Sequence, residues 1–151
     1  MMETTSNCPE CGAVWSNGQT CTDHFHQMLF WEAERPELGV VHHLMVLCYH
    51  LQHPSLYSPE GLAYGQQLLH DFVVKGISPA EVRQNRKGEV NSKNRQWKVT
   101  ARPDARGSYD QPVAWKMTAA DVVAGGADAY IDNVRLWASL AHDSLVASRQ
   151  R

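Results

Sequence analysis

The stretch CPECGAVWSNGQTCTDH, residues 8–24, holds three of the chain's four cysteines and the first of its eight histidines. Cys8 and Cys11 are separated by two residues, so a tight turn can bring both sulfurs to one metal ion. Cys21 follows ten residues later, and His24 comes three residues after it. The spacing Cys-x2-Cys-x9-Cys-x2-His therefore predicts a tetrahedral zinc site.

Other uses of these cysteines are less well supported. A redox pair like that of thioredoxin needs a buried strand before the Cys-x-x-Cys motif, and only seven residues precede Cys8. The first residues contain neither a basic segment nor the apolar run of a signal peptide, so we expect a cytoplasmic protein. Because the cytoplasm is reducing, disulfides are disfavoured, and we expect zinc as the cofactor or inert thiols.

The positions of glycines, prolines and helix-capping residues predict one domain over residues 8–151 after a flexible N-terminus at 1–7. Within it we expect a zinc knuckle at 8–21, helices at 22–88, a hairpin and loop at 89–117, and C-terminal helices at 118–147. The predicted fold is mainly α: a compact helical domain with an N-terminal zinc-knuckle-like turn and a small β-hairpin before the last helices.

Helix-capping residues and prolines predict the helix bounds. Thr22 as N-cap would open a helix over 23–34, and Ser58 would cap another that starts at Pro59. A helix between them would run from after Gly39 to His53, where Pro54 stops it. Three further segments are expected to be helical: a short one after Ser78, one begun by Thr118 with Asp121, and the last one from about 128 to 147.

The hairpin is expected from strands at 95–101 and 112–116. The last helix should face the core, because its apolar residues recur at spacings of three and four. These residues are Tyr130, Val134, Trp137, Ala141 and Leu145.

The segment VHHLMVLCYHLQHP, residues 41–54, is the second cluster of possible ligands. On a helix, His42 and His53 would stand roughly 16 Å apart, so they cannot bind the same ion. Either one could instead complete the cysteine site from elsewhere in the fold. For any single histidine, a hydrogen-bonded and half-buried side chain is the simpler interpretation. The spacing alone leaves the fourth ligand open among His24, His42 and His53.

The combination of these motifs resembles a bacterial family called domain of unknown function 5946. The resemblance rests on Cys-Pro-Glu-Cys-Gly, Cys21, the VHHL segment, the Gln-His-Pro helix end, Trp115 and the tail VRLWA at 134–138. The matching positions are Cys8, Cys11, Cys21, His42, Tyr49, Gln52, His53 and Pro54, whereas His43, His50 and Cys48 do not match. The resemblance implies no activity. It does imply that the knuckle and the Gln-His-Pro helix end form one site, which favours His53 or His42 over His24.

An enzyme is the first alternative to a structural zinc protein. Helical bundles with inward-facing histidines can hold a catalytic metal, as a hydrolase or transferase would need, and this chain is similar to the DinB-like bundles only in being helical and rich in histidine. His26 and Glu32 could act as a base and an acid if a cleft lies between them. Solvated or hydrogen-bonded side chains are the simpler explanation of this pair.

A binding module is the second alternative, because the charge is unevenly distributed. The net charge of −2 combines −7 over residues 1–74, +6 over 75–106 and −1 over 107–151. The basic segment 83–106 contains Trp97, and single-strand binders combine cations with stacking aromatics. Mutual neutralisation of the acidic and basic regions explains the pattern without a nucleic-acid or protein partner.

No membrane span is expected, since the longest uncharged stretch, residues 38–59, contains four histidines and two prolines.

Overall fold

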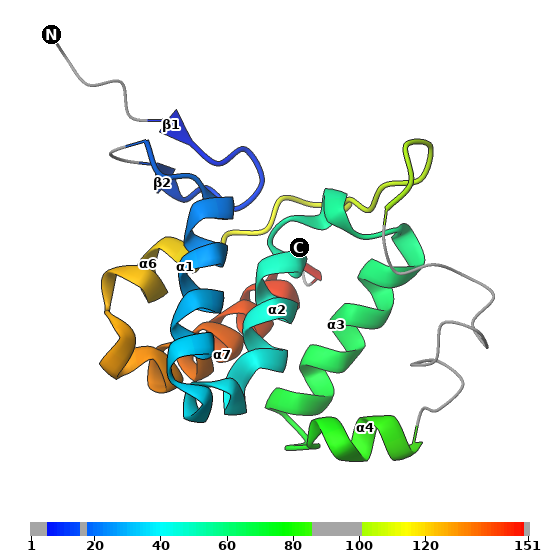
Figure 1. Cartoon of the computed structure of the whole chain (residues 1–151). Coiled ribbons are helices and arrows are strands. Elements are labelled where there is room, and N and C mark those ends of the chain that lie inside the picture. The colour runs from blue at the N-terminus through cyan, green and yellow to red at the C-terminus, as the bar shows by residue number, and fades with distance from the viewer. Residues whose placement is uncertain (1–5, 16–17, 86–100, 150–151) are drawn as a thin grey trace, which may run out of the picture.

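The computed structural model describes residues 6–15, 18–85 and 101–149, and it has the predicted mainly helical fold (Figure 1). Two strands form the only sheet of these residues: β1 (Ser6–Asn7) and β2 (Val14–Trp15). The helical elements, with η marking 3-10 helices, are α1 (Cys21–Glu34), η1 (Pro36–Val41), α2 (His42–Leu51), η2 (Pro54–Leu56), α3 (Pro59–Val73), α4 (Pro79–Asn85), α6 (Ala119–Ala124), η3 (Ala127–Ala129) and α7 (Tyr130–Arg149).

The small hairpin lies at the N-terminal end of the chain. Antiparallel pairing matches Ser6 with Trp15 and Asn7 with Val14, so the turn between the strands carries the Cys8–Cys11 motif. Ser6 and Asn7, expected in a loose N-terminus, thus belong to a strand, while residues 1–5 lie outside the described part of the chain.

The hairpin expected before the last helices needs correction. Its first strand, 95–101, falls almost entirely outside the described residues, and residues 112–116 form no strand. In the described segment 101–117, Arg102 and Ala105 form an isolated antiparallel bridge around a tight turn, and the residues on either side of this turn bond to η2 and Tyr57. The backbone N–H of Ala101 donates to the carbonyl of Leu56 at 3.0 Å, and that of Gly107 donates to Tyr57 at 2.7 Å. Because these donors bind η2 and the residue after it, they are not available to a partner strand.

Most helix starts follow the predicted caps. Ser58 accepts a hydrogen bond from the N–H of Gly61 at 2.9 Å, and Thr118 forms a capping box with its partner Asp121. The cap of α1 is Thr20 rather than the expected Thr22, because Thr20 and Asp23 bond reciprocally as a capping box. The helix therefore begins at Cys21.

The second helix ends earlier than predicted. It stops at Leu51, and His53 adopts φ −128° and ψ 67°. A residue that precedes proline is disfavoured in the helical region, so Pro54 removes His53 from the helix.

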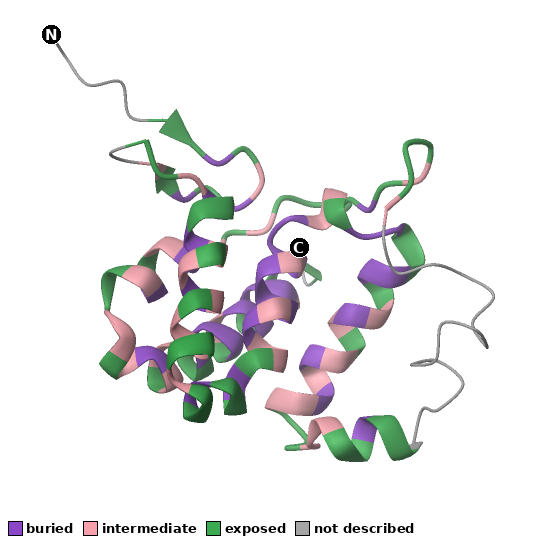
Figure 2. Cartoon of the chain, viewed as in Figure 1, coloured by how far each residue is buried: buried purple, intermediate pink, exposed green. Residues whose placement is uncertain are grey.

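The core lies where α7 packs against α2 and α3, and purple ribbon marks this region in Figure 2. The predicted stripe of α7 is confirmed, since Tyr130, Val134, Trp137, Ala141 and Leu145 are all buried. Met45 and Leu51 of α2 and Leu69 of α3 complete the contact, each with no exposed surface. Burial of these large apolar side chains stabilises the helical body.

The 101–117 segment also fastens the C-terminal end of α2. Tyr109 donates its hydroxyl hydrogen to the carbonyl of Leu51, and the Gln52 amide donates to the carbonyl of Met117 at 2.6 Å. Gly107 approaches Pro54 so closely that a Cβ there would lie 2.8 Å from the Pro54 carbonyl oxygen. These contacts fix the backbone on both sides of His53.

Two further sequence expectations concern the basic segment and membrane spans. Most of the basic segment 83–106, including Trp97, lies outside the described residues, so its proposed binding role stays a prediction. None of the described helices combines the length and apolar character that crossing a membrane requires.

Candidate metal centre

The Cys8–Cys11 turn is closed by backbone hydrogen bonds. The N–H of Cys8 donates to Ala13 at 2.8 Å, and the N–H of Gly12 donates to the carbonyl of Cys8 at 2.9 Å. Gly12 has φ +81°, a conformation that other residues resist. The N–H of Cys11 points at the Cys8 sulfur, 3.5 Å away. A backbone donor of this kind stabilises a thiolate, which is the form that binds metals.

Cys21 is brought to this turn by the start of α1. Its sulfur lies 3.6 Å from the Cys11 sulfur. The indole N–H of Trp15, at the end of β2, donates to the Cys21 sulfur at 3.2 Å. The hairpin and the capped first turn of α1 therefore hold three sulfurs on one side of the knuckle.

His53 supplies the fourth side chain. Its Nδ1 lies 2.6 Å from the carbonyl oxygen of Tyr49, and its Nε2 lies 3.5 Å from the Cys8 sulfur. A carbonyl can only accept, so Nδ1 carries the hydrogen and the lone pair of a neutral ring is on Nε2. The Tyr49 ring packs on the imidazole with centroids 4.4 Å apart. The ring is thus oriented with its lone pair toward the sulfurs.

Together these four residues form a group that could hold a metal ion. The ligand atoms of Cys8, Cys11, Cys21 and His53 all lie within 4.8 Å of one another. The residues are 6, 5, 4 and 6% exposed, respectively. Within the described ranges, no second cluster of three or more Cys, His, Asp or Glu side chains has this geometry.

The protonation of the cluster reflects its crowding. A hydrogen bond from Cys11 lowers the pKa of the Cys21 thiol, while the same bond and burial raise the pKa of Cys11. Burial disfavours charge on His53, but bonds to the Cys21 sulfur and the Tyr49 carbonyl, and the nearby thiolates, raise its pKa to about 9. The lowered pKa of Cys21 and the raised pKa of His53 favour an ion pair of thiolate and imidazolium in the metal-free state. A divalent cation could replace the protons that these groups share.

The remaining sequence candidates lie outside this group. His24 is buried in α1, and His26 is exposed on the same helix. His42 lies 2.6 Å from the Glu32 carboxylate, which also accepts from the Tyr130 hydroxyl. Glu32 thus bonds to His42 and Tyr130, and the suggested acid and base pair of His26 and Glu32 stays a prediction.

Tyr49 and Gln52 hold neighbouring parts of the site in place and are not members of the ligand group. Tyr49 contributes its carbonyl and ring to His53, and Gln52 binds the 101–117 segment. Cys48 is fully buried in α2, and burial raises the pKa of its thiol, as expected for a small core residue.

Two contacts of the knuckle were not foreseen from the sequence. Trp15 binds the Cys21 sulfur, and the Glu10 carboxylate accepts from the backbone N–H of Ser55 at 3.1 Å. Glu10 lies between the two cysteines of the Cys-Pro-Glu-Cys motif, where an acceptor side chain can reach a neighbouring backbone. Trp15 lies in the hairpin, six residues before Cys21. The sequence carries no signal that would pair Glu10 with Ser55.

Comparisons with known proteins place the chain in a family. The model of the Family of unknown function (DUF5946) matches residues 6–145, which include the hairpin, the four clustered side chains and most of α7. Neither the curated proteins nor the solved structures contain a match to the chain. The match covers most of the sequence and agrees with the family that the motifs indicated, so the chain belongs to the Family of unknown function (DUF5946).

Proposed function

We propose that Cys8, Cys11, Cys21 and His53 bind one zinc ion whose role is structural. The observation that carries this proposal is the orientation of His53. Its Nδ1–H is held by a backbone carbonyl, and its Nε2 lone pair faces three buried sulfurs. Metal-binding histidines commonly use the second ring nitrogen in this way, because the outer hydrogen bond fixes the tautomer.

The spacing of the ligand atoms supports zinc. In a tetrahedral site with Zn–S bonds of about 2.3 Å, neighbouring ligand atoms stand about 3.6 to 3.8 Å apart. The Cys11 and Cys21 sulfurs are 3.6 Å apart, and the Cys8 sulfur is 3.5 Å from Nε2 of His53. Three thiolates and one imidazole also match the donor preference of zinc.

A structural role follows from what the ligands connect. Three ligands come from the hairpin and the start of α1, while His53 comes from the far end of α2. The ion would join the hairpin to the helical body, beside the bond between Glu10 and Ser55. Residues 8–151 would accordingly fold as one domain. All four cysteines are free thiols, and a reducing cytoplasm would keep them available.

Metal analysis of the purified protein tests the proposal. We expect one zinc per chain, with three sulfurs and one nitrogen around it in X-ray absorption spectra. Cys11→Ser should weaken zinc binding by about a hundredfold or more, because a thiolate ligand is lost. Cys48→Ala is the matched control, since it removes a buried sulfur outside the cluster and should retain one zinc per chain.

Two results would reject the proposal. One is a folded, reduced protein that takes up no zinc even when zinc is supplied. The other is equal zinc content in the Cys11→Ser and Cys48→Ala variants.

A catalytic metal is the second candidate because a cavity adjoins the cluster. Cys8 and Cys11 help to line a space of about 750 Å³ that continues to Tyr109 and Trp115. Cobalt substitution separates the two roles. A closed site keeps the same visible spectrum when azide or cyanide is added, whereas an open site changes its spectrum because the anion occupies a coordination position. A changed spectrum would favour the enzyme.

A further inference from the structure

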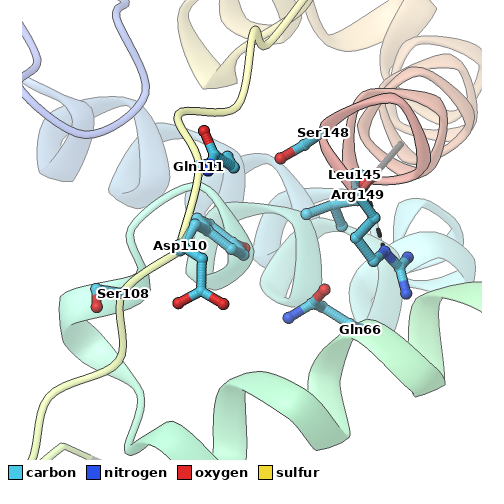
Figure 3. A pocket seen from close by; sticks show the side chains of 8 residues that line it. Gln66, Ser108, Asp110, Gln111, Leu145, Ser148 and Arg149 are labelled. Carbon is cyan, nitrogen blue, oxygen red and sulfur yellow. Dashed lines mark hydrogen bonds between the residues drawn. The ribbon is translucent and has the colours of Figure 1, made fainter. Parts of the chain in front are cut away.

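A second feature of the molecule, separate from the cysteine cluster, is a polar cavity near the end of α7. Its volume is about 440 Å³, within the range of small-molecule sites. Three parts of the chain form its walls: α3 with Gln66, the 108–111 stretch with Asp110 and Gln111, and α7 with Ser148 and Arg149 (Figure 3). Walls from three distant segments make this a concave site rather than a single exposed side chain.

The cavity continues into a neighbouring one. The second cavity, of about 360 Å³, shares Gln66 and Arg149 with the first and adds Gln67 and His70 of α3. The imidazole Nδ1 of His70 lies 3.1 Å from Nε2 of His142. Amides, an imidazole and a guanidinium predominate here, so the ligand should be polar.

Arg149 presents a free hydrogen-bonding edge to the cavity. Its Nε donates to the carbonyl of Leu145, one turn earlier in the same helix, at 3.4 Å. This bond directs the side chain and leaves both terminal nitrogens for another acceptor. Among the residues that the structure describes, no carboxylate forms an ion pair with Arg149. Two parallel N–H groups of this kind suit a carboxylate.

Asp110 contributes the opposite charge. It lines the same cavity, yet it makes no hydrogen bond or ion pair with another described residue. Figure 3 shows its carboxylate and the Arg149 guanidinium on either side of the Gln66 amide. An acid and a base therefore face one cavity without neutralising each other.

We propose that this cavity binds a small zwitterion of the α-amino-acid class. Arg149 would take the carboxylate and Asp110 the ammonium group, with the Gln66 amide bonding between them. The adjoining cavity, with Gln67 and His70, would take a polar side chain. A simple anion would meet repulsion from Asp110, and a simple cation would meet repulsion from Arg149. Both charges are solvent-exposed, so screening keeps the affinity modest.

Titration of the full-length protein with amino acids of defined chemistry tests this inference. The probes are L-glutamine and L-serine, each compared with its N-acetyl form and its carboxamide form. The readout is the backbone amide shifts of residues 108–111 and 145–149 in nitrogen-15 correlation spectra. We expect at least one zwitterion to bind with a dissociation constant below about 10 mM and at least tenfold tighter than both blocked forms.

Charge-removing variants assign each end of the ligand. Arg149→Gln should reduce zwitterion affinity to that of the carboxamide, and Asp110→Asn should reduce it to that of the N-acetyl form. Arg135→Gln and Asp132→Asn are matched controls, because both residues are exposed on α7 and neither lines the cavity. The controls should bind as the wild type does.

Three outcomes would overturn the inference. Equal binding of the N-acetyl form would identify a plain anion site. Equal binding of the carboxamide form would identify a plain cation site. No shift changes with either amino acid up to about 10 mM would mean that the cavity is not a site for zwitterions. None of these outcomes depends on zinc, so they leave the proposed metal centre untouched.

Discussion

Replacing Gly107 by alanine should destabilise the protein by forcing two fixed pieces of backbone apart. A Cβ at this position would lie 2.8 Å from the carbonyl oxygen of Pro54 and 3.2 Å from the Leu62 side chain. Neither backbone can easily retreat. The N–H of Gly107 is bound to the carbonyl of Tyr57 at 2.7 Å, and the Pro54 carbonyl accepts from the N–H of Tyr57 at 3.1 Å. Relief of the clash would stretch or break one of these bonds.

The expected cost is about 2 kcal/mol in the free energy of unfolding, in the range of overpacked sites and lost hydrogen bonds. For a chain of this size, that corresponds to a fall in Tm of about 4 to 8 °C. Because Pro54 directly follows His53, zinc affinity should also fall, by about tenfold, as for a displaced supporting contact. Gly39→Ala is the matched control, since a Cβ there has no atom within 4 Å. Its effect should stay within about 0.5 kcal/mol.

Urea unfolding followed by circular dichroism at 222 nm, together with zinc competition against a chelator, measures both quantities. If Gly107→Ala unfolds at the same urea concentration as Gly39→Ala, the 101–117 segment does not press on Pro54 as described. Unchanged zinc affinity in a destabilised variant would show instead that the segment supports the fold without positioning His53.

Three further predictions concern the core and the metal centre. Trp137→Ala should cost about 3 to 5 kcal/mol, because its side chain has no exposed surface, whereas Leu136→Ala, at a residue 50% exposed, should change stability by less than about 0.5 kcal/mol in urea melts. Trp15→Phe removes the N–H that binds the Cys21 sulfur, so the sulfur-to-metal charge-transfer band of the cobalt protein should shift and metal affinity should fall by up to about tenfold. In the metal-free, reduced protein, the lowered pKa of Cys21 and the raised pKa of His53 set the pH dependence of stability. Between about pH 4 and 6.5 the unfolded pair binds two protons and the folded pair one, so stability should rise with pH up to 6.5; between 6.5 and 9 each state binds one, so stability should stay level. A stability that falls steadily from pH 5 to 6.5 in chelator would contradict this ion pair.

The sequence predicted those features that depend on neighbouring residues. The caps at Ser58 and Thr118 and the apolar stripe of α7 follow from spacings of three and four, and the structure has all of them. The cap at Thr20 was missed although Asp23 completes its box, because Thr22 also precedes a polar first turn. Local patterns thus located the helices but placed the start of α1 two residues too late.

The family resemblance implied that His53 meets the cysteines, but other contacts between distant residues could not be predicted. The carboxylate of Glu32 meets the hydroxyl of Tyr130 across 98 residues, and Gln52 binds the Met117 carbonyl across 65. These bonds depend on how helices and the 101–117 segment pack, and packing is not encoded in any short spacing. Residues 112–116, expected as a strand, form none, and their expected partner at 95–101 lies almost entirely outside the described residues.

The arrangement of the four clustered residues indicates which of them matters most to the fold. Cys8, Cys11 and Cys21 fall within 14 residues, so a metal bound to them alone would close only short loops. His53 lies 45 residues from Cys8, and its ligation would link the hairpin to the end of α2. Closing this longer loop removes more freedom from the unfolded chain, although the entropy grows only slowly with loop length. The larger effect is local: the Glu10 bond to Ser55 is a single, partly buried hydrogen bond and contributes about 1 kcal/mol. If the proposed metal binds, ligation by His53 would therefore provide the stronger attachment between the hairpin and the end of α2, and the bond of its ring to the Tyr49 carbonyl already orients it for this role.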